Sequence, residues 1–170
     1  SGGSNNRSLR LASATAGSAA ATWDIAAGNT LQLDGVAAQF GTLTGSGTVT
    51  NSSNSAPATA IVGAGNFAGT LADGTSRSTA LTKTGTGTLT LTGPNSYTGT
   101  TTVTAGLLVT TPDQSGGGDL TVNDGAAFGV ALETPDTTFT AGTVTLDGTL
   151  QVDIGQLANS TIAPITAEEL

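Results

Sequence analysis

Short alternations of apolar and polar residues recur along this chain. In four of them every second residue is Leu or Val. These are TLQL at 30–33, TLTL at 88–91, TVTL at 143–146 and TLQV at 149–152. A period of two places alternate side chains on one face of an extended segment, so each predicts a short β-strand with one buried face. Turn-forming residues follow closely at 34–35 (DG), 93–95 (GPN) and 147–148 (DG), and these predict where the strands end.

The spacing of these units indicates a structural repeat. Counted from the residue that opens each unit, Asn29 to Gly47 is 18 residues, Gly47 to Gly87 is 40, and Gly87 to Gly106 is 19. A period of roughly 20 residues lies at the short end of solenoid repeat lengths. After Gly106 the spacing becomes irregular.

Two all-β architectures fit this pattern. In a parallel β-helix, each coil of about 20 residues carries two or three short strands, and successive coils stack. In an antiparallel β-sandwich, short strands with turns every 8–12 residues give a similar pattern. Small, uniform apolar residues, repeated Gly-x-Gly turns and Thr or Asn side chains that could form ladders between coils favour the β-helix. The segments 143–146 and 149–152 could instead form a local hairpin.

Composition supports a thin, repetitive core. Apolar residues make up 36% of the 170 residues and aromatic residues only 4%, while about one residue in five is Thr and 25 are Gly. Thr favours extended backbone and Gly supplies the positive φ angles that turns need. The sequence therefore predicts very little α-helix.

Charge and residue usage remove several functional classes. Four basic residues against 12 acidic ones give a net charge of −8, which disfavours nucleic acid and anionic lipid as partners. The chain has no His and no Cys, so it offers no Ser-His-Asp or Cys-His arrangement, no disulfide and no imidazole or thiolate metal site. It also lacks a run of eighteen apolar residues, so we expect no direct membrane insertion.

The remaining candidates for chemistry are acidic residues. Paired carboxylates could act as in glycosidases, and the pairs or groups close in sequence are Asp147/Asp153, Asp113/Asp119/Asp124 and Glu133/Asp136. Most of them lie in Asp-Gly or Asn-Asp-Gly turns, where Asp binds nearby backbone N–H groups. A polysaccharide lyase would also need a basic residue, for which Arg77 and Lys83 are the candidates. The glycine-rich segment 116–124 does not fit the spacing of a calcium-binding nonapeptide. We therefore expect no catalytic residue, no metal and no cofactor.

Two aromatic residues are weak candidates for ligand binding. Carbohydrate-binding modules present aromatic platforms, and only Trp23 and Tyr97 qualify here. The structural interpretation is favoured for both residues: Trp23 would cap the open end of the first coil, and Tyr97 would pack near a turn.

Residues 81–109 read LTKTGTGTLTLTGPNSYTGTTTVTAGLLV. The opening LTKTG, the strand GTLTL, and the later YTG, TTV, AG and LV occur in an order that resembles the autotransporter-associated β-strand repeat, also called the passenger-associated transport repeat. Pro94 and Leu107 depart from the pattern, at positions where less constrained or Thr-like residues are expected. The rest of the chain shares only the style of the family, apart from 66–74, which resembles the segment that commonly precedes the repeat.

This resemblance implies a right-handed parallel β-helix from the secreted or surface-displayed passenger of a Gram-negative autotransporter. It implies a role in export and folding, or in adhesion, rather than catalysis. We expect a linker or N-terminal cap at 1–22, coils over 23–155, and a C-terminal cap or truncated coil at 156–170. The expected partners are the rest of the polypeptide with a C-terminal β-barrel translocator, a second copy through end coils or a flat face, and a glycan. Capping by 9–14 and 162–170, or end-to-end stacking, should protect the exposed end coils.

Overall fold

The computed structural model describes residues 7–13, 16–112, 116–132, 137–153 and 165–169, and these residues contain β-strands and no α-helix. The strands are β1 (Ser8–Leu11), β2 (Gly17–Ile25), β3 (Thr30–Leu33), β4 (Ala37–Gly45), β5 (Thr48–Asn51), β6 (Ala58–Phe67), β7 (Thr70–Ala72), β8 (Thr79–Lys83), β9 (Thr88–Leu91), β10 (Thr101–Val103), β11 (Gly106–Thr110), β12 (Leu120–Val122), β13 (Ala126–Ala131), β14 (Phe139–Leu146), β15 (Thr149–Asp153) and β16 (Ile165–Glu169).

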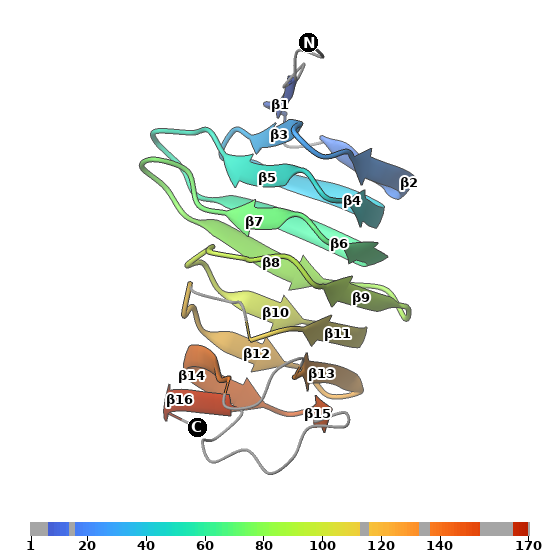
Figure 1. Cartoon of the computed structure of the whole chain (residues 1–170), viewed down its shortest axis with the longest axis vertical. Helices are drawn as coiled ribbons and strands as arrows, with labels where there is room; N and C mark the ends of the chain where they lie inside the picture. The colour runs from blue at the N-terminus through green and yellow to red at the C-terminus, as the bar shows by residue number, and fades with distance from the viewer. Residues whose placement is uncertain (1–6, 14–15, 113–115, 133–136, 154–164, 170) are drawn as a thin grey trace.

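The strands wind into a single column of coils with the two ends of the chain at opposite ends of the column (Figure 1). Every described strand pair is parallel, which excludes the antiparallel sandwich. The predicted all-β parallel solenoid is confirmed, with about six turns. Partner residues are separated by as few as 18 positions, between Thr30 and Thr48, and as many as 26, between Phe139 and Ile165.

Three strand positions recur around the solenoid, and we call them faces A, B and C. Face A contains β1, β3, β5 and β7. Face B contains the first halves of β2, β4 and β6, followed by β8, β10, β12, β14 and β16. Face C contains the second halves of β2, β4 and β6, followed by β9, β11, β13 and β15.

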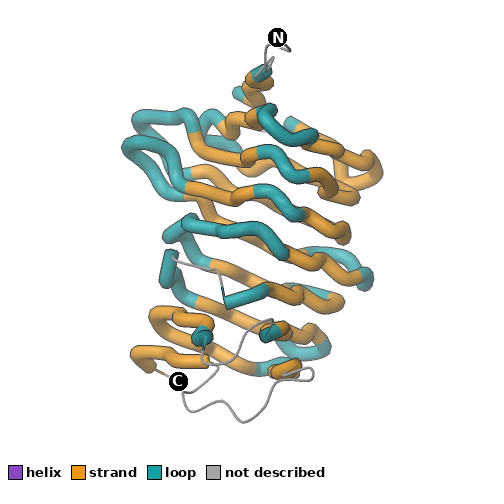
Figure 2. The backbone as a smooth tube through the Cα atoms, viewed as in Figure 1, coloured by secondary structure: helices purple, strands orange, loops and turns teal. Residues whose placement is uncertain are grey.

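The cross-section of the solenoid changes at β6. The strands β2, β4 and β6 are 9 to 10 residues long and run through faces B and C without a break. The first half of β6 pairs with β8 and its second half pairs with β9, so from here each coil has two short strands separated by a corner. Figure 2 shows this as loop segments that interrupt the strands in the lower coils. The segments 143–146 and 149–152 belong to two such strands, β14 and β15. The structure excludes the local hairpin, because β14 pairs with β12 and β16 whereas β15 pairs with β13.

Equivalent apolar side chains stack over one another inside the solenoid. On face A the inward file is Leu9, Leu31, Val49 and Leu71, of which all but Leu9 are buried. On face C the file contains the buried residues Leu43, Leu89, Leu108 and Phe128, with Gly65 between Leu43 and Leu89. The Leu and Val residues of the alternating segments are therefore the ones that point into the interior. Burial of each Leu or Val contributes about 1.5–3 kcal/mol to its coil.

Buried polar side chains secure the corners through hydrogen bonds to the backbone. Asn51 is buried after β5, where its Oδ1 accepts hydrogen bonds from the N–H groups of Gly35 (3.1 Å) and Ser53 (2.9 Å). Its Nδ2 donates to the carbonyl oxygens of Ala56 (2.9 Å) and Ser78 (3.1 Å). Gly35 belongs to the preceding coil and Ser78 to the following one. The Asn51 side chain thus provides hydrogen-bond partners for backbone N–H and C=O groups in three coils. A ladder of stacked amide side chains would leave these backbone groups unpaired.

Both ends of the solenoid expose inward-facing apolar residues. At the N-terminal end Leu9 is 54% exposed because no described strand lies beyond it. At the C-terminal end Leu146, Leu150 and Val152 are 40–41% exposed. Parts of both predicted caps form strands: β1 and the first half of β2 lie within 1–22, and β16, within 156–170, extends face B beside β14. End-to-end stacking stays a prediction.

The close approach of successive coils predicts a sharp difference between two glycines in strands. Gly65 has φ +143°, and a Cβ there would lie 2.0 Å from the carbonyl oxygen of Leu43 in the preceding coil. At Gly129 the nearest atom to a Cβ is a side-chain carbon at 3.6 Å. We expect Gly65→Ala to lower the free energy of unfolding by about 3 kcal/mol or more, and Gly129→Ala to change it by less than about 1 kcal/mol. Chemical denaturation of the two variants measures this, and equal effects would contradict the stacked geometry.

Candidate functional site

Where the structure describes them, the acidic residues proposed from sequence lie in turns and corners beside the strands. The described residues hold no cluster of three metal-ligating side chains. Asp119 Oδ1 accepts a hydrogen bond from the Thr143 N–H (2.9 Å), which links two coils. Asp124 and Asp147 lie at corners between strands of faces B and C. Asp113, Glu133 and Asp136 lie outside the described residues, as does the side chain of Asp153.

The two basic candidates for a lyase lie in different surroundings. Arg77 is in the exposed loop 73–78, where its Nε donates to the carbonyl oxygen of Asn54 (3.4 Å). Lys83 is completely buried in the core. The structure therefore does not bring Arg77 and Lys83 together with an acidic group in one groove.

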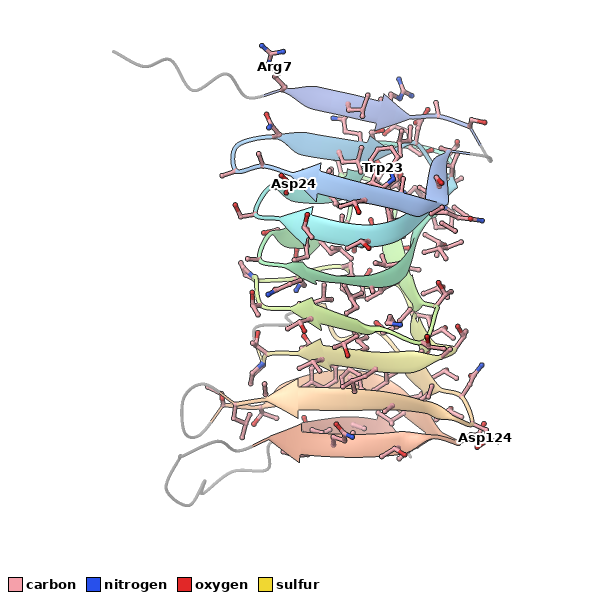
Figure 3. The ribbon with its side chains drawn as sticks, turned by 90° about the vertical axis from the view of Figure 1, so that its right-hand side faces the viewer. Arg7, Trp23, Asp24 and Asp124 are labelled. Atoms are coloured by element: carbon pink, nitrogen blue, oxygen red, sulfur yellow. The ribbon has the colours of Figure 1, made fainter. Side chains whose placement is uncertain are left out.

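Trp23 packs in the first complete coil. It lies on β2 directly above Leu43, and its ring meets that of Phe40 edge-on, with centroids 5.4 Å apart and an interplanar angle of 86°. Figure 3 shows it toward the same end of the column as Arg7, with Asp124 toward the other end. Its indole Nε1 is buried and has no hydrogen-bond partner in the structure. Trp23 thus serves as part of the interior packing of the first coil, and its role in ligand binding stays a prediction.

Tyr97 is held inside the wall of the solenoid. It is 8% exposed, and its hydroxyl shares a hydrogen bond of 2.8 Å with Thr101 Oγ1 at the start of β10. A space of about 20 Å³ beside the ring, bordered by the glycines at 116–118, is too small for a sugar. Burial raises the pKa of Tyr97 to about 12, and the hydrogen bond with Thr101 partly offsets this effect. The residue is therefore poorly placed to stack on a ligand.

Lys83 is the most unusual side chain of the interior. It follows Val62 and precedes Val103 in an inward file of face B whose other members are apolar. Its Nζ donates to the carbonyl oxygens of Thr84, Gly85 (2.9 Å) and Ala105 (3.1 Å). None of these acceptors is an Asn or Asp side chain, which an intramolecular isopeptide bond would require. Burial lowers the pKa of the Lys83 ammonium.

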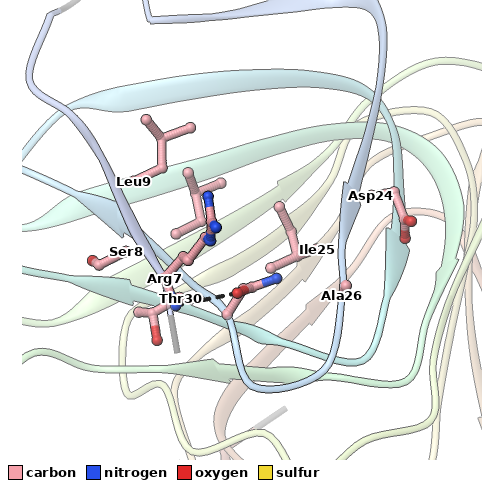
Figure 4. Close-up of a pocket in the computed structure, with 9 residues that line it drawn as sticks. Arg7, Ser8, Leu9, Asp24, Ile25, Ala26 and Thr30 are labelled. Atoms are coloured by element: carbon pink, nitrogen blue, oxygen red, sulfur yellow. Dashed lines mark hydrogen bonds between the residues drawn. The ribbon is translucent and has the colours of Figure 1, made fainter. Parts of the chain in front are cut away.

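The N-terminal end of the solenoid carries a hollow of about 340 Å³ between β1 and β2, lined in part by Leu9, Ile25 and Leu31 (Figure 4). At its edge the backbone N–H of Arg7 donates to Asn29 Oδ1 (3.2 Å). The apolar residues that line the hollow face the position of a further coil. The hollow is therefore open because no described coil covers this end of the solenoid.

A second hollow, of about 400 Å³, lies at the edge of face A. We call it the polar groove, and its lining includes Gln32, Thr50, Ser52, Asp73 and Thr75. These residues come from three successive coils, because the loops 52–57 and 73–78 project beyond the shorter turn 34–36. Ser52 Oγ is buried and has no hydrogen-bond partner in the structure.

Asp73 is the charged residue of the polar groove, and it is held firmly. Its Oδ1 accepts hydrogen bonds from the Thr79 N–H (2.7 Å) and the Thr98 N–H (3.1 Å), and its Oδ2 accepts one from Thr98 Oγ1 (2.6 Å). The carboxylate therefore shapes the loop and joins it to the next coil.

Comparison with known families gives one match. Residues 81–109 match the model of the passenger-associated-transport-repeat. The match covers the segment from which the resemblance was recognised and confirms it. It takes in most of β8 and β11 with all of β9 and β10, and it includes both Lys83 and Tyr97. A comparison with curated proteins gave no match, and a comparison with solved structures gave none.

Sequence reasoning missed two features of these sites. Lys83 lies in a period-two segment (TALTK) at a position where the alternation calls for an apolar residue, and that position was the available signal for a buried cation. The polar groove had no such signal, because loops from three coils form it.

The raised pKa of Tyr97 predicts a loss of stability at high pH. Below pH 10 the phenol is neutral in both states. Between pH 10 and about 12 it ionises first in the unfolded chain, so the free energy of unfolding should fall as pH rises, by up to about 2–3 kcal/mol. Tyr97→Phe removes this contribution, while the other titrating groups are the same in both proteins. Urea denaturation of both from pH 8 to 12 checks the prediction, and parallel curves would contradict it.

Proposed function

We propose that this chain is a structural segment of an autotransporter-type passenger. In this role it is displayed at, or secreted from, the surface of a Gram-negative bacterium, assists export by folding coil by coil, and acts as an extended stalk without catalytic activity. The single observation that carries the proposal is the family match at 81–109, which lies in the middle of a continuous parallel solenoid.

The physical properties of the solenoid support this role. Each coil contacts mainly its neighbours, so folding can proceed from one coil to the next as the chain emerges. The strands, corners and buried Asn side chains all bond to the adjacent coil, which provides a template for each addition. Because the chain has no Cys, it has no disulfides to form, and it can cross a narrow pore unfolded and gain its stability afterwards. The acidic surface limits self-adhesion during this passage.

A charge in the interior of the repeat should block display. Leu89 is fully buried on face C between Gly65 and Leu108. We expect Leu89→Asp to lower the free energy of unfolding by about 4 kcal/mol or more, because the carboxylate would be buried without a partner. In a strain that exports the full-length protein, the amount of folded passenger at the surface should fall to a small fraction of the wild-type level.

Thr90→Asp provides the matched control. It introduces the same charge at the next residue of β9, on the outer side of the strand. Display should remain close to the wild-type level. Surface proteolysis of intact cells with an antibody readout compares the two variants. Undiminished display of a Leu89→Asp protein that does not fold in vitro would contradict the role of folding in export.

The polar groove favours a second function, that of an adhesin-like module that binds glycans. Its volume of about 400 Å³ falls within the usual range of ligand sites, and hydroxyl, amide and carboxylate groups line it. The groove has no aromatic platform, so binding would depend on hydrogen bonds.

A pair of glutamines tests this second function. Gln32 lines the groove, whereas Gln39 lies exposed on face B. If the chain binds neutral oligosaccharides on a glycan array, Gln32→Ala should weaken binding by about tenfold, since loss of a good hydrogen bond is worth about 1 kcal/mol or more. Gln39→Ala should leave it unchanged. An absence of binding across the array, or equal effects of the two variants, would reject the groove as a glycan site.

A further inference from the structure

Lys83 is the only Lys of the chain, and its position is at odds with its chemistry. The inward file on face B runs from Phe40 through Val62, Lys83, Val103 and Val122. The four other side chains are apolar and buried, and Lys83 itself is 0% exposed. A cation at such a position is costly unless hydrogen bonds replace its hydration shell.

The three hydrogen bonds of the ammonium account for all of its donors. Two acceptors, the carbonyl oxygens of Thr84 and Gly85, belong to the corner between β8 and β9. Gly85 has φ +67°, a conformation that suits glycine in this tight corner. The third acceptor, the carbonyl oxygen of Ala105 at 3.1 Å, belongs to the corner between β10 and β11 in the next coil. The ammonium is therefore fully bonded only when two successive coils are stacked.

Lys83 also lies where the solenoid changes its cross-section. The preceding coil passes through faces B and C as the unbroken strand β6, and Lys83 is the last residue before the first true corner. From this point on, the residue that begins each corner donates its N–H to a carbonyl oxygen in the preceding coil. The acceptor is the last inward residue of face B in that coil. Thr84 donates to Val62 (2.8 Å) and Thr104 donates to Lys83 (2.9 Å).

The strands around Lys83 define their register poorly on their own. The segment before Val103 is the run Thr100-Thr101-Thr102, and β9 repeats Thr-Leu twice. A slip of one residue would turn inward side chains outward, but a slip of two keeps the alternation, and in β10 it exchanges Val103 for Thr101 or Ala105 beside Lys83. The inward side chains of β10 therefore give little penalty for a two-residue slip.

We propose that Lys83 sets the register in which the coil of β10 and β11 stacks on the coil of β8 and β9. In the native register the Ala105 carbonyl completes the ammonium's set of acceptors. A slip of two residues carries that carbonyl away and leaves a buried charge short of a partner. A buried Asn sets the register of coiled coils by the same principle, at a cost in stability. The register role stands whether or not the chain is exported; its consequence for export rests on the proposed function.

Cysteine pairs can report the register, because the chain has no native Cys. Thr82 and Thr102 are register partners on the outer side of face B, so Thr82→Cys with Thr102→Cys reports the native stack. Thr82→Cys with Thr100→Cys, or with Thr104→Cys, reports a slip of two residues in either direction. In the native register the slipped pairs are too far apart for a disulfide. Each pair is built into the 170-residue chain with Lys83 or with Lys83→Met, refolded from denaturant, oxidised and scored by mass spectrometry for free thiols.

With Lys83 present, the native pair should cross-link and the slipped pairs should remain as thiols. With Lys83→Met, the cross-linked fraction of at least one slipped pair should rise by about tenfold, because slipping no longer strands a charge. Leu81→Met is the control, since it changes another fully buried residue of β8 and leaves the ammonium in place. It should keep the native register.

A structural role alone would give a different result. If Lys83→Met unfolds at lower denaturant but keeps only native cross-links, the proposal is overturned. If Lys83→Met does not fold, Lys83→Gln, which retains two N–H donors without the charge, takes its place; failure of both to fold would also overturn the register role.

Display on cells separates the two proposals. Lys83→Met should reach the surface with a larger protease-sensitive fraction than Leu81→Met. Slipped cross-links in vitro with unchanged display would support the register role and count against folding-assisted export.

Discussion

The parallel stacking of one coil on the next is the constraint on which the rest of this molecule depends. It places the same strand position of each coil over that of its neighbour, so that Leu31 lies over Val49 and Leu89 over Leu108. It also brings backbone so close that several glycines cannot carry a side chain, as at Gly65. The hydrophobic core is therefore a set of files along the axis, and each coil is stabilised mainly by the coil before it and the coil after it.

Such a repetitive core stabilises the solenoid well but distinguishes poorly between alternative stackings. Polar residues that are buried or half-buried supply that distinction. Asn51 bonds to backbone in its own coil and in both neighbours, Asp73 joins its loop to the following coil, and Lys83 collects carbonyl oxygens from two corners. Each of these side chains is satisfied in only one arrangement of coils. Apolar files thus provide the free energy of stacking, and a few buried polar groups select its geometry.

This division suits the proposed role, in which the chain folds after crossing a membrane. The described residues contain no helix that could span a bilayer. The matched repeat lies at the centre of the solenoid, at the point where unbroken strands give way to strands separated by corners. A segment that both continues the template and fixes its register would help later coils to add correctly. The polar groove extends from the coil of β3 to the coil of β7, which leads directly into the matched repeat, and its Asp73 binds Thr98 within that repeat.

The sequence by itself determined the strand type, the period and the family of the central segment. Leu and Val alternate with Thr in the strands, Asp-Gly turns follow them, and these units recur at spacings of 18 and 19 residues. The strands and turns are local signals, and local backbone preferences are enough to produce them. It also indicated the parallel arrangement, through the small and uniform core residues. Only the tertiary structure decided how Asn51 and Lys83 are used, that 143–146 and 149–152 do not form a hairpin, and that loops from three coils form a groove. These features depend on residues about twenty positions apart, and no local pattern specifies which of them will meet.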